Sequence, residues 1–255
     1  MPTNTLTVIT QGLSGDGPLD TAASRCILNA VNRGDMGETL EVATPHRVLA
    51  FGKHDTSASG FDQAVSAAKR RGFQPTVRIA GGRAAVFHEH TVRFGWTLPV
   101  EDPASSMHAR FEVLAQAVVD ALSALGIEAA IGEVPGEYCP GRYSVHISGR
   151  KIMGVGQRLT KNAAYVGGVI VLGGAHLIND VLRPVYDHLG LPFDPVATGA
   201  LSDVCHVLKE DLMEVFVEQI AGTRKIVESA VPDTVQLAAQ AMRTEHDPTI
   251  LAGPA

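Results

Sequence analysis

The 255-residue sequence contains too little cysteine to build a disulfide framework or a cysteine-rich metal knuckle. Its three cysteines, Cys26, Cys139 and Cys205, are far apart and odd in number, whereas both kinds of site need closely spaced pairs. Reduced thiols are the ordinary state of cysteine in the cytosol. We therefore expect a cytoplasmic protein.

The sequence also lacks a hydrophobic run that could cross a membrane. Its longest central stretch without charged or amide side chains is residues 163–175, whereas a membrane-spanning helix needs about 20 apolar residues. The first ten residues have neither the basic start nor the apolar core of a secretion signal. Apolar residues still make up 45% of the chain, which is enough for a folded core. No membrane partner is expected.

Positive charge is scarce overall but unevenly placed. The formal net charge is −6, which argues against a nucleic-acid partner, and residues 203–255 hold nine acidic and only four basic side chains. Two windows, residues 63–88 and 138–179, contain no Asp or Glu but ten of the 21 basic residues. One interpretation is an anion site where the windows meet in the fold, and the other is solvated surface cations.

Strand patterns outnumber helix patterns along the chain. Alternating or β-branched segments predict strands over residues 4–10, 39–43, 47–51, 74–79, 84–88, 92–98, 143–147, 149–155 and 165–172. Helical apolar spacing predicts helices over residues 21–33, 61–71, 103–125, 179–189, 207–220 and 233–243. Because the two kinds do not alternate strictly, we expect an α+β fold with a mostly antiparallel sheet.

A first candidate segment, RIAGGRAAVFH, leads from a strand into two glycines. Gly81 and Gly82 can adopt positive φ and let a ligand approach the backbone, and Arg78 and Arg83 flank them. The segment has no Lys-Ser/Thr pair for a P-loop and the wrong glycine spacing for a dinucleotide fingerprint. A glycine pair between strands is also often a simple turn.

A second segment, GRKIMGVGQR, carries Lys151 in a strand pattern with Gly154 and Gly156. A lysine that points inward is costly unless it meets an anion, and the alternative is an edge-strand lysine that prevents aggregation. In a third segment, EYCPGRY, Cys139 precedes a Pro-Gly turn inside the second cationic window. Nearby positive charge favours the reactive thiolate, while a buried structural thiol is the other interpretation.

The first two segments, in this order and at this spacing, resemble the lipoate–protein ligases and octanoyltransferases of the biotin/lipoyl ligase family over roughly residues 15–220. The resemblance implies a class II synthetase-like α+β fold, with a mixed, mostly antiparallel sheet flanked by helices. It also implies attachment of an octanoyl or lipoyl group to a lysine of a lipoyl carrier domain. Residues 1–202 would form the catalytic domain, and residues 203–255 an acidic helical extension of that domain.

The resemblance also implies roles for individual residues. Lys151 would hold the acyl carbonyl or an adenylate, and Cys139 would carry the acyl group in a transferase. The substrate-binding residues would be Arg78, Gly81, Gly82, Arg83, His88, Gly154, Gly156 and Gln157. Because lipoyl carriers are usually acidic, we expect the carrier to dock on Arg142, Arg158 and Lys161. The apolar strand faces at residues 77–86 and 169–172 could form an acyl tunnel or simply core.

Two chemistries share this fold. A ligase activates free lipoate with ATP and Mg²⁺, whereas a transferase moves an acyl group from acyl carrier protein onto its own cysteine. Ligases typically have a third glycine where this chain has Arg83, and an asparagine that HEHTVRFGWT lacks, so transfer through Cys139 is slightly favoured. The family's usual His-Gly is replaced by the run Val166 to Gly168, which keeps a non-catalytic binder of lipoyl domains or acyl groups as a third hypothesis. His88 and His90 lack a third ligand, so no structural metal is expected.

Overall fold

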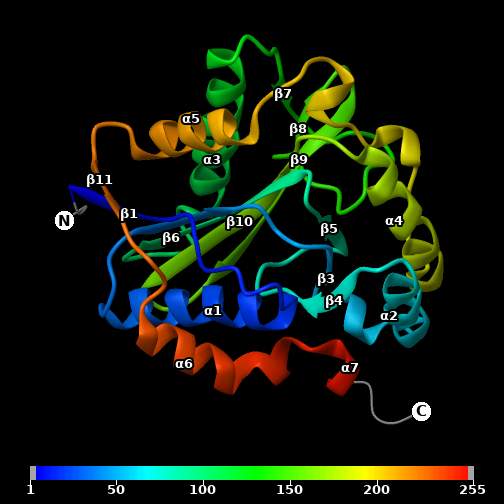
Figure 1. Cartoon of the computed structure of the whole chain (residues 1–255), viewed down its shortest axis with the longest axis horizontal. Coiled ribbons are helices and arrows are strands. Elements are labelled where there is room, and N and C mark those ends of the chain that lie inside the picture. The colour runs from blue at the N-terminus through cyan, green and yellow to red at the C-terminus, as the bar shows by residue number, and fades with distance from the viewer. Residues whose placement is uncertain (1–3, 252–255) are drawn as a thin grey trace.

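The computed structural model describes residues 4–251, which form two β-sheets packed with helices (Figure 1). Within these residues the larger sheet has eight strands in the order β11-β1-β2-β6-β10-β9-β8-β7, and the smaller has the order β4-β3-β5. β1 pairs in parallel with both β11 and β2, and β3 pairs in parallel with β4. The remaining neighbours are antiparallel, so the sheet is mixed and mostly antiparallel, as the sequence predicts.

The strands of the larger sheet are β1 (Thr5–Ile9), β2 (Thr39–Ala43), β6 (Thr91–Pro99), β7 (Ala130–Ile131), β8 (Val145–Ile147), β9 (Arg150–Leu159), β10 (Ala163–Val171) and β11 (Lys225–Glu228). Those of the smaller sheet are β3 (Val48–Phe51), β4 (Gln74–Val77) and β5 (Ala85–Phe87). The α-helices are α1 (Gly17–Arg33), α2 (Phe61–Arg70), α3 (Met107–Ala124), α4 (Ala175–Leu189), α5 (Lys209–Ala221), α6 (Asp233–Met242) and α7 (Pro248–Leu251).

The larger sheet lies between two helical layers (Figure 1). On one face, Leu40, Phe94 and Val166 share a core with Leu114 of α3 and Phe216 of α5. On the other face α1 packs on the sheet and α6 packs on α1, shown in blue and orange-red at the bottom of Figure 1. Burial of one apolar face of each helix against the sheet is the main source of stability in such a layered domain.

The smaller sheet forms a second core with α2 and α4. Its strands β4 and β5 are joined by residues 78–84, which contain the glycine pair. The segment that contains Cys139 joins β7 to β8. The loop with the glycine pair, from the smaller sheet, and the segment with Cys139, from the larger sheet, therefore lie side by side.

Most predicted elements are present at the expected positions, but some boundaries differ. α3 begins at Met107 and α4 at Ala175, and residues 143–144 precede β8 instead of belonging to it. Two strands were not predicted, β7 and β11. The expected Ser148-Gly149 turn between β8 and β9 is confirmed, since both residues have positive φ (50° and 74°).

The segment predicted as an acidic helical extension also contributes a strand, because β11 adds to the edge of the larger sheet. Leu212 and Phe216 of α5 lie in the same core as α3. Residues 1–3 and 252–255, the outer ends of the two predicted segments, lie outside the described residues. Across residues 4–251, none of the helices has the length and apolar character needed to cross a membrane.

Candidate active site

The two acid-free windows meet around the thiol of Cys139. Arg78 and Arg83 of the β4–β5 loop both contact its sulfur, and Lys151 of β9 contacts its backbone. The two windows therefore meet in the fold at these three cations, while the binding of an anion there stays a prediction. Acidic residues from outside the windows also enter the cluster, so it is not purely cationic.

The sulfur of Cys139 lies in a nest of donors. The Nη2 atom of Arg78 is 3.1 Å from Sγ, and the backbone nitrogen of Arg83 is 3.3 Å from it. Gly82, with φ of 99°, leaves the space for this approach, because a Cβ atom there would lie 2.8 Å from Sγ. The side chain is half-buried.

These contacts change the acidity of the thiol. Burial raises the pKa of the Cys139 thiol, but the charges of Arg78 and Lys151 and the hydrogen bonds from Arg83 and Arg78 lower it more. The pKa of Cys139 therefore lies below its ordinary value. A lowered pKa increases the thiolate fraction, and the thiolate is the nucleophilic form.

Lys151 is completely buried, with 1% of its surface exposed. Its Nζ donates to the carbonyl oxygens of Tyr138 (2.9 Å) and Cys139 (3.0 Å) and lies 3.3 Å from Oε2 of Glu137. Because β9 lies between β8 and β10, the edge-strand alternative is wrong. The prediction of an inward lysine that meets an anion is confirmed, but the anion is a carboxylate of the protein itself.

The backbone of Cys139 is fixed on both sides. Its φ is 44°, in the left-handed region that non-glycine residues rarely occupy. Its N–H donates to the hydroxyl of Tyr186 (2.7 Å), and that hydroxyl donates to the carbonyl of Ala84 (2.9 Å). Burial raises the pKa of Tyr186 well above its usual value, so the hydroxyl keeps its proton. Tyr186 of α4 thus ties the thiol loop to the loop that follows the glycine pair.

Two buried carboxylates complete the cluster. Glu137 accepts hydrogen bonds from the backbone of Gly141 (2.8 Å) and the hydroxyl of Ser144 (2.9 Å). Asp55 is fully buried, accepts from the backbone of Gly52 (2.8 Å) and pairs with the guanidinium of Arg83 at 3.2 Å. The Arg83 side chain is therefore neutralised within the protein, while its backbone N–H points at the thiol.

Of the other predicted substrate residues, the glycines and Gln157 lie beside the cluster, whereas His88 does not. Gly81 packs over β9, because its nitrogen donates to the Gln157 carbonyl (3.2 Å) and its oxygen lies 2.9 Å from a Cβ position on Gly156. The Gln157 side chain is held by Arg110 of α3 at 2.7 Å. Gly154 makes room for Lys151, whose Cε lies 3.0 Å from its Cβ position. These residues shape the site through the backbone.

His88 is not brought to this cluster. It is buried at the end of β5, where its ring lies beside His90 and Gly174, and burial lowers its pKa to about 4. Within residues 4–251, no three His, Cys, Asp or Glu side chains are placed to hold a metal ion. The three predicted docking cations, Arg142, Arg158 and Lys161, are exposed.

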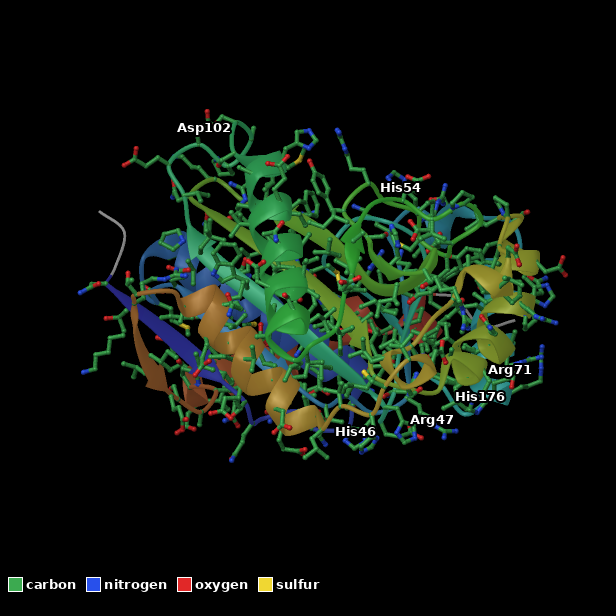
Figure 2. The ribbon with its side chains drawn as sticks, turned by 90° about the horizontal axis from the view of Figure 1, so that it is seen from above. His46, Arg47, His54, Arg71, Asp102 and His176 are labelled. Atoms are coloured by element: carbon green, nitrogen blue, oxygen red, sulfur yellow. The ribbon has the colours of Figure 1, made fainter. Side chains whose placement is uncertain are left out.

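A pocket of about 70 Å³ lies beside the cluster, between α1, the smaller sheet and the centre of the larger sheet. Arg78, which touches the thiol, lines it, together with apolar residues such as Val48 and Phe94. His46 also lines it and is an exposed side chain at the edge of the molecule in Figure 2. The pocket thus leads from the cationic cluster toward the molecular surface.

No role was predicted from the sequence for three residues of the cluster. Glu137 lies inside the segment singled out for Cys139, but only its burial distinguishes it from a surface acid. Asp55 closes a turn after Gly52, a weak local signal. Tyr186 is one residue of an amphipathic helix, and no pattern in the sequence marks it as a partner of Cys139.

Known proteins resemble this chain both in sequence and in structure. The model of the lipoyl protein ligase A/B catalytic domain matches residues 18–187. An octanoyl-[GcvH]:protein N-octanoyltransferase of Geobacillus kaustophilus is 24% identical over 167 residues, which cover 65% of this chain and 59% of that protein. A lipoyl-[GcvH]:protein N-lipoyltransferase of Listeria monocytogenes is 22% identical over 176 residues, which cover 65% of this chain and 62% of that protein.

The chain therefore spans somewhat less than two thirds of the length of these curated relatives. The crystal structure of a lipoate-protein ligase A bound with ATP superposes with a TM-score of 0.75 at 17% identity, covering 95% of this chain and 94% of that one. At this identity the likeness concerns the fold, and it confirms the predicted fold class.

Proposed function

Because the chain belongs to the lipoyl protein ligase A/B catalytic domain family, we propose that it is an enzyme that transfers an octanoyl or lipoyl group to a lysine of a lipoyl carrier domain. We propose that Cys139 carries the acyl group between donor and acceptor. The observation that supports this route is the half-buried thiol with two donors aimed at its sulfur. The pKa of the Cys139 thiol, which lies below its ordinary value, also supports this route.

In the first step, the Cys139 thiolate attacks the acyl carbonyl of the donor. The bond from sulfur to the carbonyl carbon forms, the bond from that carbon to the donor carrier breaks, and the leaving atom of the donor takes up a proton. The N–H of Arg83 and the guanidinium of Arg78 are within hydrogen-bond distance of the sulfur. They would be the nearest donors for the negative charge that develops on the carbonyl oxygen.

In the second step, the amine of an acceptor lysine attacks the thioester carbonyl. A carbon–nitrogen bond forms, the carbon–sulfur bond breaks, and the amine loses a proton as Cys139 leaves as a thiolate. The same charges that favour a thiolate in the free enzyme make it a better leaving group here. Lys151 contributes by holding the carbonyls of Tyr138 and Cys139.

Two contacts weigh against an ATP-dependent ligase. Arg83 is paired with Asp55, and Lys151 with Glu137. An adenylate needs cations that are free for its phosphate. In the proposed route ATP and Mg²⁺ are therefore not required, and lipoate or octanoate is the transferred group.

The proposed carrier differs in part from the sequence-based expectation of acyl carrier protein. The names of the relatives specify octanoyl- or lipoyl-GcvH, and we propose a carrier of that kind as donor here. We also propose that carriers dock through Arg142, Arg158 and Lys161, which are exposed. A lipoyl carrier with an acidic surface would be attracted to this patch and repelled by the acidic residues 203–255.

Intact-mass measurement of wild type and a Cys139→Ser variant tests the route. Each protein is mixed with octanoylated GcvH, without ATP. We expect wild type to gain the mass of one octanoyl group and the variant to gain none, with octanoyl transfer to a fresh carrier abolished. Octanoylated acyl carrier protein serves as the comparison donor.

Other outcomes separate the alternatives. Acyl loading in both proteins would contradict the role of Cys139. No loading, with carrier modification that depends on free lipoate and Mg-ATP, would identify a ligase. Carrier binding without any modification under either condition would favour a non-catalytic binder.

A further inference from the structure

The centre of the larger sheet carries a row of glycines that leads away from the thiol. Gly156 of β9 pairs with Gly167 of β10, Gly167 pairs with Gly95 of β6, and Gly95 pairs with Glu41 of β2. Residues paired across strands present their side chains on the same face. Strands lie about 4.8 Å apart, so the glycines remove side chains from a trough about 10 Å long.

The trough begins beneath the glycine pair of the active site. The carbonyl oxygen of Gly81 lies 2.9 Å from the Cβ position on Gly156, at the β9 end of the row. A Cβ atom on the next residue, Gly82, would lie 2.8 Å from the sulfur of Cys139. Gly167, Arg78 and Ala80 all line the pocket described above. The middle of the trough is therefore part of the floor of this pocket, and Arg78 connects the pocket to the thiol of Cys139.

One side chain occupies this floor. Tyr165 precedes Gly167 by two residues on β10, so it stands on the same face. Its Cε2 and hydroxyl oxygen lie 2.8 Å and 3.0 Å from the Cβ position on Gly95, and its ring also covers Gly167. A methyl group at either glycine would collide with the ring. The glycines thus provide the space that the phenol fills.

The far end of the trough is closed by a buried polar network, in which Arg93 donates a hydrogen bond to the hydroxyl of Tyr165. Arg93 pairs with Glu41 at 3.3 Å, and Ser24 of α1 donates to the same carboxylate at 2.8 Å. Tyr165 is itself 6% exposed, and Ser24, Arg93 and Tyr165 all line the pocket. An apolar chain longer than the pocket would have to displace the phenol or lie against a buried ion pair.

We propose that Tyr165 is the specificity-determining residue for acyl chain length: its phenol fills the glycine trough and restricts the transferred group to medium length. This inference rests on the proposed function, because it assumes that the pocket beside Cys139 holds the acyl group. Replacement of the ring by a small side chain would open the trough toward Gly95. Each methylene that enters the opened space would then gain about fourfold in binding.

The test compares wild type with Tyr165→Ala for loading of Cys139 from octanoyl, decanoyl and dodecanoyl forms of GcvH. We expect wild type to prefer octanoyl, and the variant to raise the dodecanoyl-to-octanoyl rate ratio at least tenfold. Tyr165→Leu, which leaves a smaller opening and less loss of packing, should give a smaller shift in the same direction. Tyr165→Phe retains the ring and should keep the wild-type preference.

A matched control removes a tyrosine ring elsewhere. Tyr143 stacks on Phe111 of α3, on the opposite side of the sheet from α1, so Tyr143→Ala should leave the length preference unchanged. Calorimetric titration with free octanoic, decanoic and dodecanoic acids measures the same preference without any chemistry. If the wild type neither loads nor binds these chains, or if Tyr165→Ala and Tyr165→Leu keep its preference, the inference is overturned.

Acyl loading and calorimetric titration together also distinguish failure of this inference from failure of the proposed function. Absence of loading together with a length-dependent affinity that Tyr165→Ala shifts would contradict the transferase and support the role of Tyr165. Normal loading with an unchanged length preference would support the transferase and contradict the role of Tyr165.

Discussion

The two ends of the site are built in opposite ways. At the thiol end, the sulfur, the N–H and the carbonyl of Cys139 each have a protein partner, supplied by Arg78, Tyr186 and Lys151. At the other end, Gly95 and Gly167 carry no side chains, and the ring of Tyr165 fills the space above them. The comparison teaches that the thiol is controlled by contacts that are added, whereas the space that holds the Tyr165 ring comes from side chains that are left out.

The largest expected effect comes from removal of the charge at the centre of the thiol end. Lys151→Met keeps the length of the side chain but leaves Glu137 buried without its cation. Loss of one partner of a buried pair costs about 3–5 kcal/mol of unfolding free energy. We expect this destabilisation in chemical denaturation, together with at least a 100-fold loss of acyl loading. The thiol loop loses both its carbonyl contacts and a charge that lowers the pKa of Cys139.

A double variant distinguishes stability from chemistry at this position. Lys151→Met with Glu137→Gln replaces the buried pair by neutral groups and should recover most of the lost stability. Acyl loading should remain low, because the charge near the thiol is still absent. Recovery of loading in the double variant would mean that Lys151 serves only the stability of the fold.

A smaller effect is expected when the second charge at the thiol end is removed. Arg78 lowers the pKa of Cys139, so Arg78→Met should raise it. The thiolate then forms only at higher pH, and the pH profile of alkylation by iodoacetamide should move upward. At neutral pH we expect a several-fold slower reaction, with Cys139→Ser as the background. An unchanged profile would contradict the assignment of Arg78 as a source of the shift.

The smallest effect is expected from exposed charges that belong neither to the thiol end nor to the glycine row. Arg158 and Lys161 are exposed, and the double reversal Arg158→Glu with Lys161→Glu should weaken carrier binding several-fold at low salt. The effect should shrink as salt is added, because exposed charges are screened. Loading of Cys139 from a small acyl thioester should be unaffected. Equal carrier binding by wild type and the reversal variant would remove this surface from the docking proposal.

The sequence predicted the thiol end better than the end that contains the glycine row. The glycine pair, the arginines beside it and the inward Lys151 each have a local pattern, and the structure brings them together. Glu137, the partner of Lys151, was not recognised, because burial of a carboxylate depends on the tertiary fold. The Tyr186 contact joins residues 47 apart in the sequence, and no periodicity encodes such a distance.

The glycine row was not recognised for a different reason. The glycine row depends on the register of three strands, in which Gly95, Gly156 and Gly167 come from separate segments. The strand faces that suggested an acyl tunnel include Val86 and Val171, which lie in the core beneath α4. Alternation predicts which face of a strand is buried, but not which residue of a neighbouring strand will stand opposite.

The pairing of β1 with β11 has a consequence for the order in which the molecule is assembled. Thr5 pairs with Lys225, about 220 residues later in the chain, so the outer edge of β1 has no partner while the intervening chain is synthesised. Contacts of such long sequence separation form slowly. An unpaired strand edge recruits other chains, so we expect the nascent protein to carry an aggregation-prone edge until β11 has been synthesised.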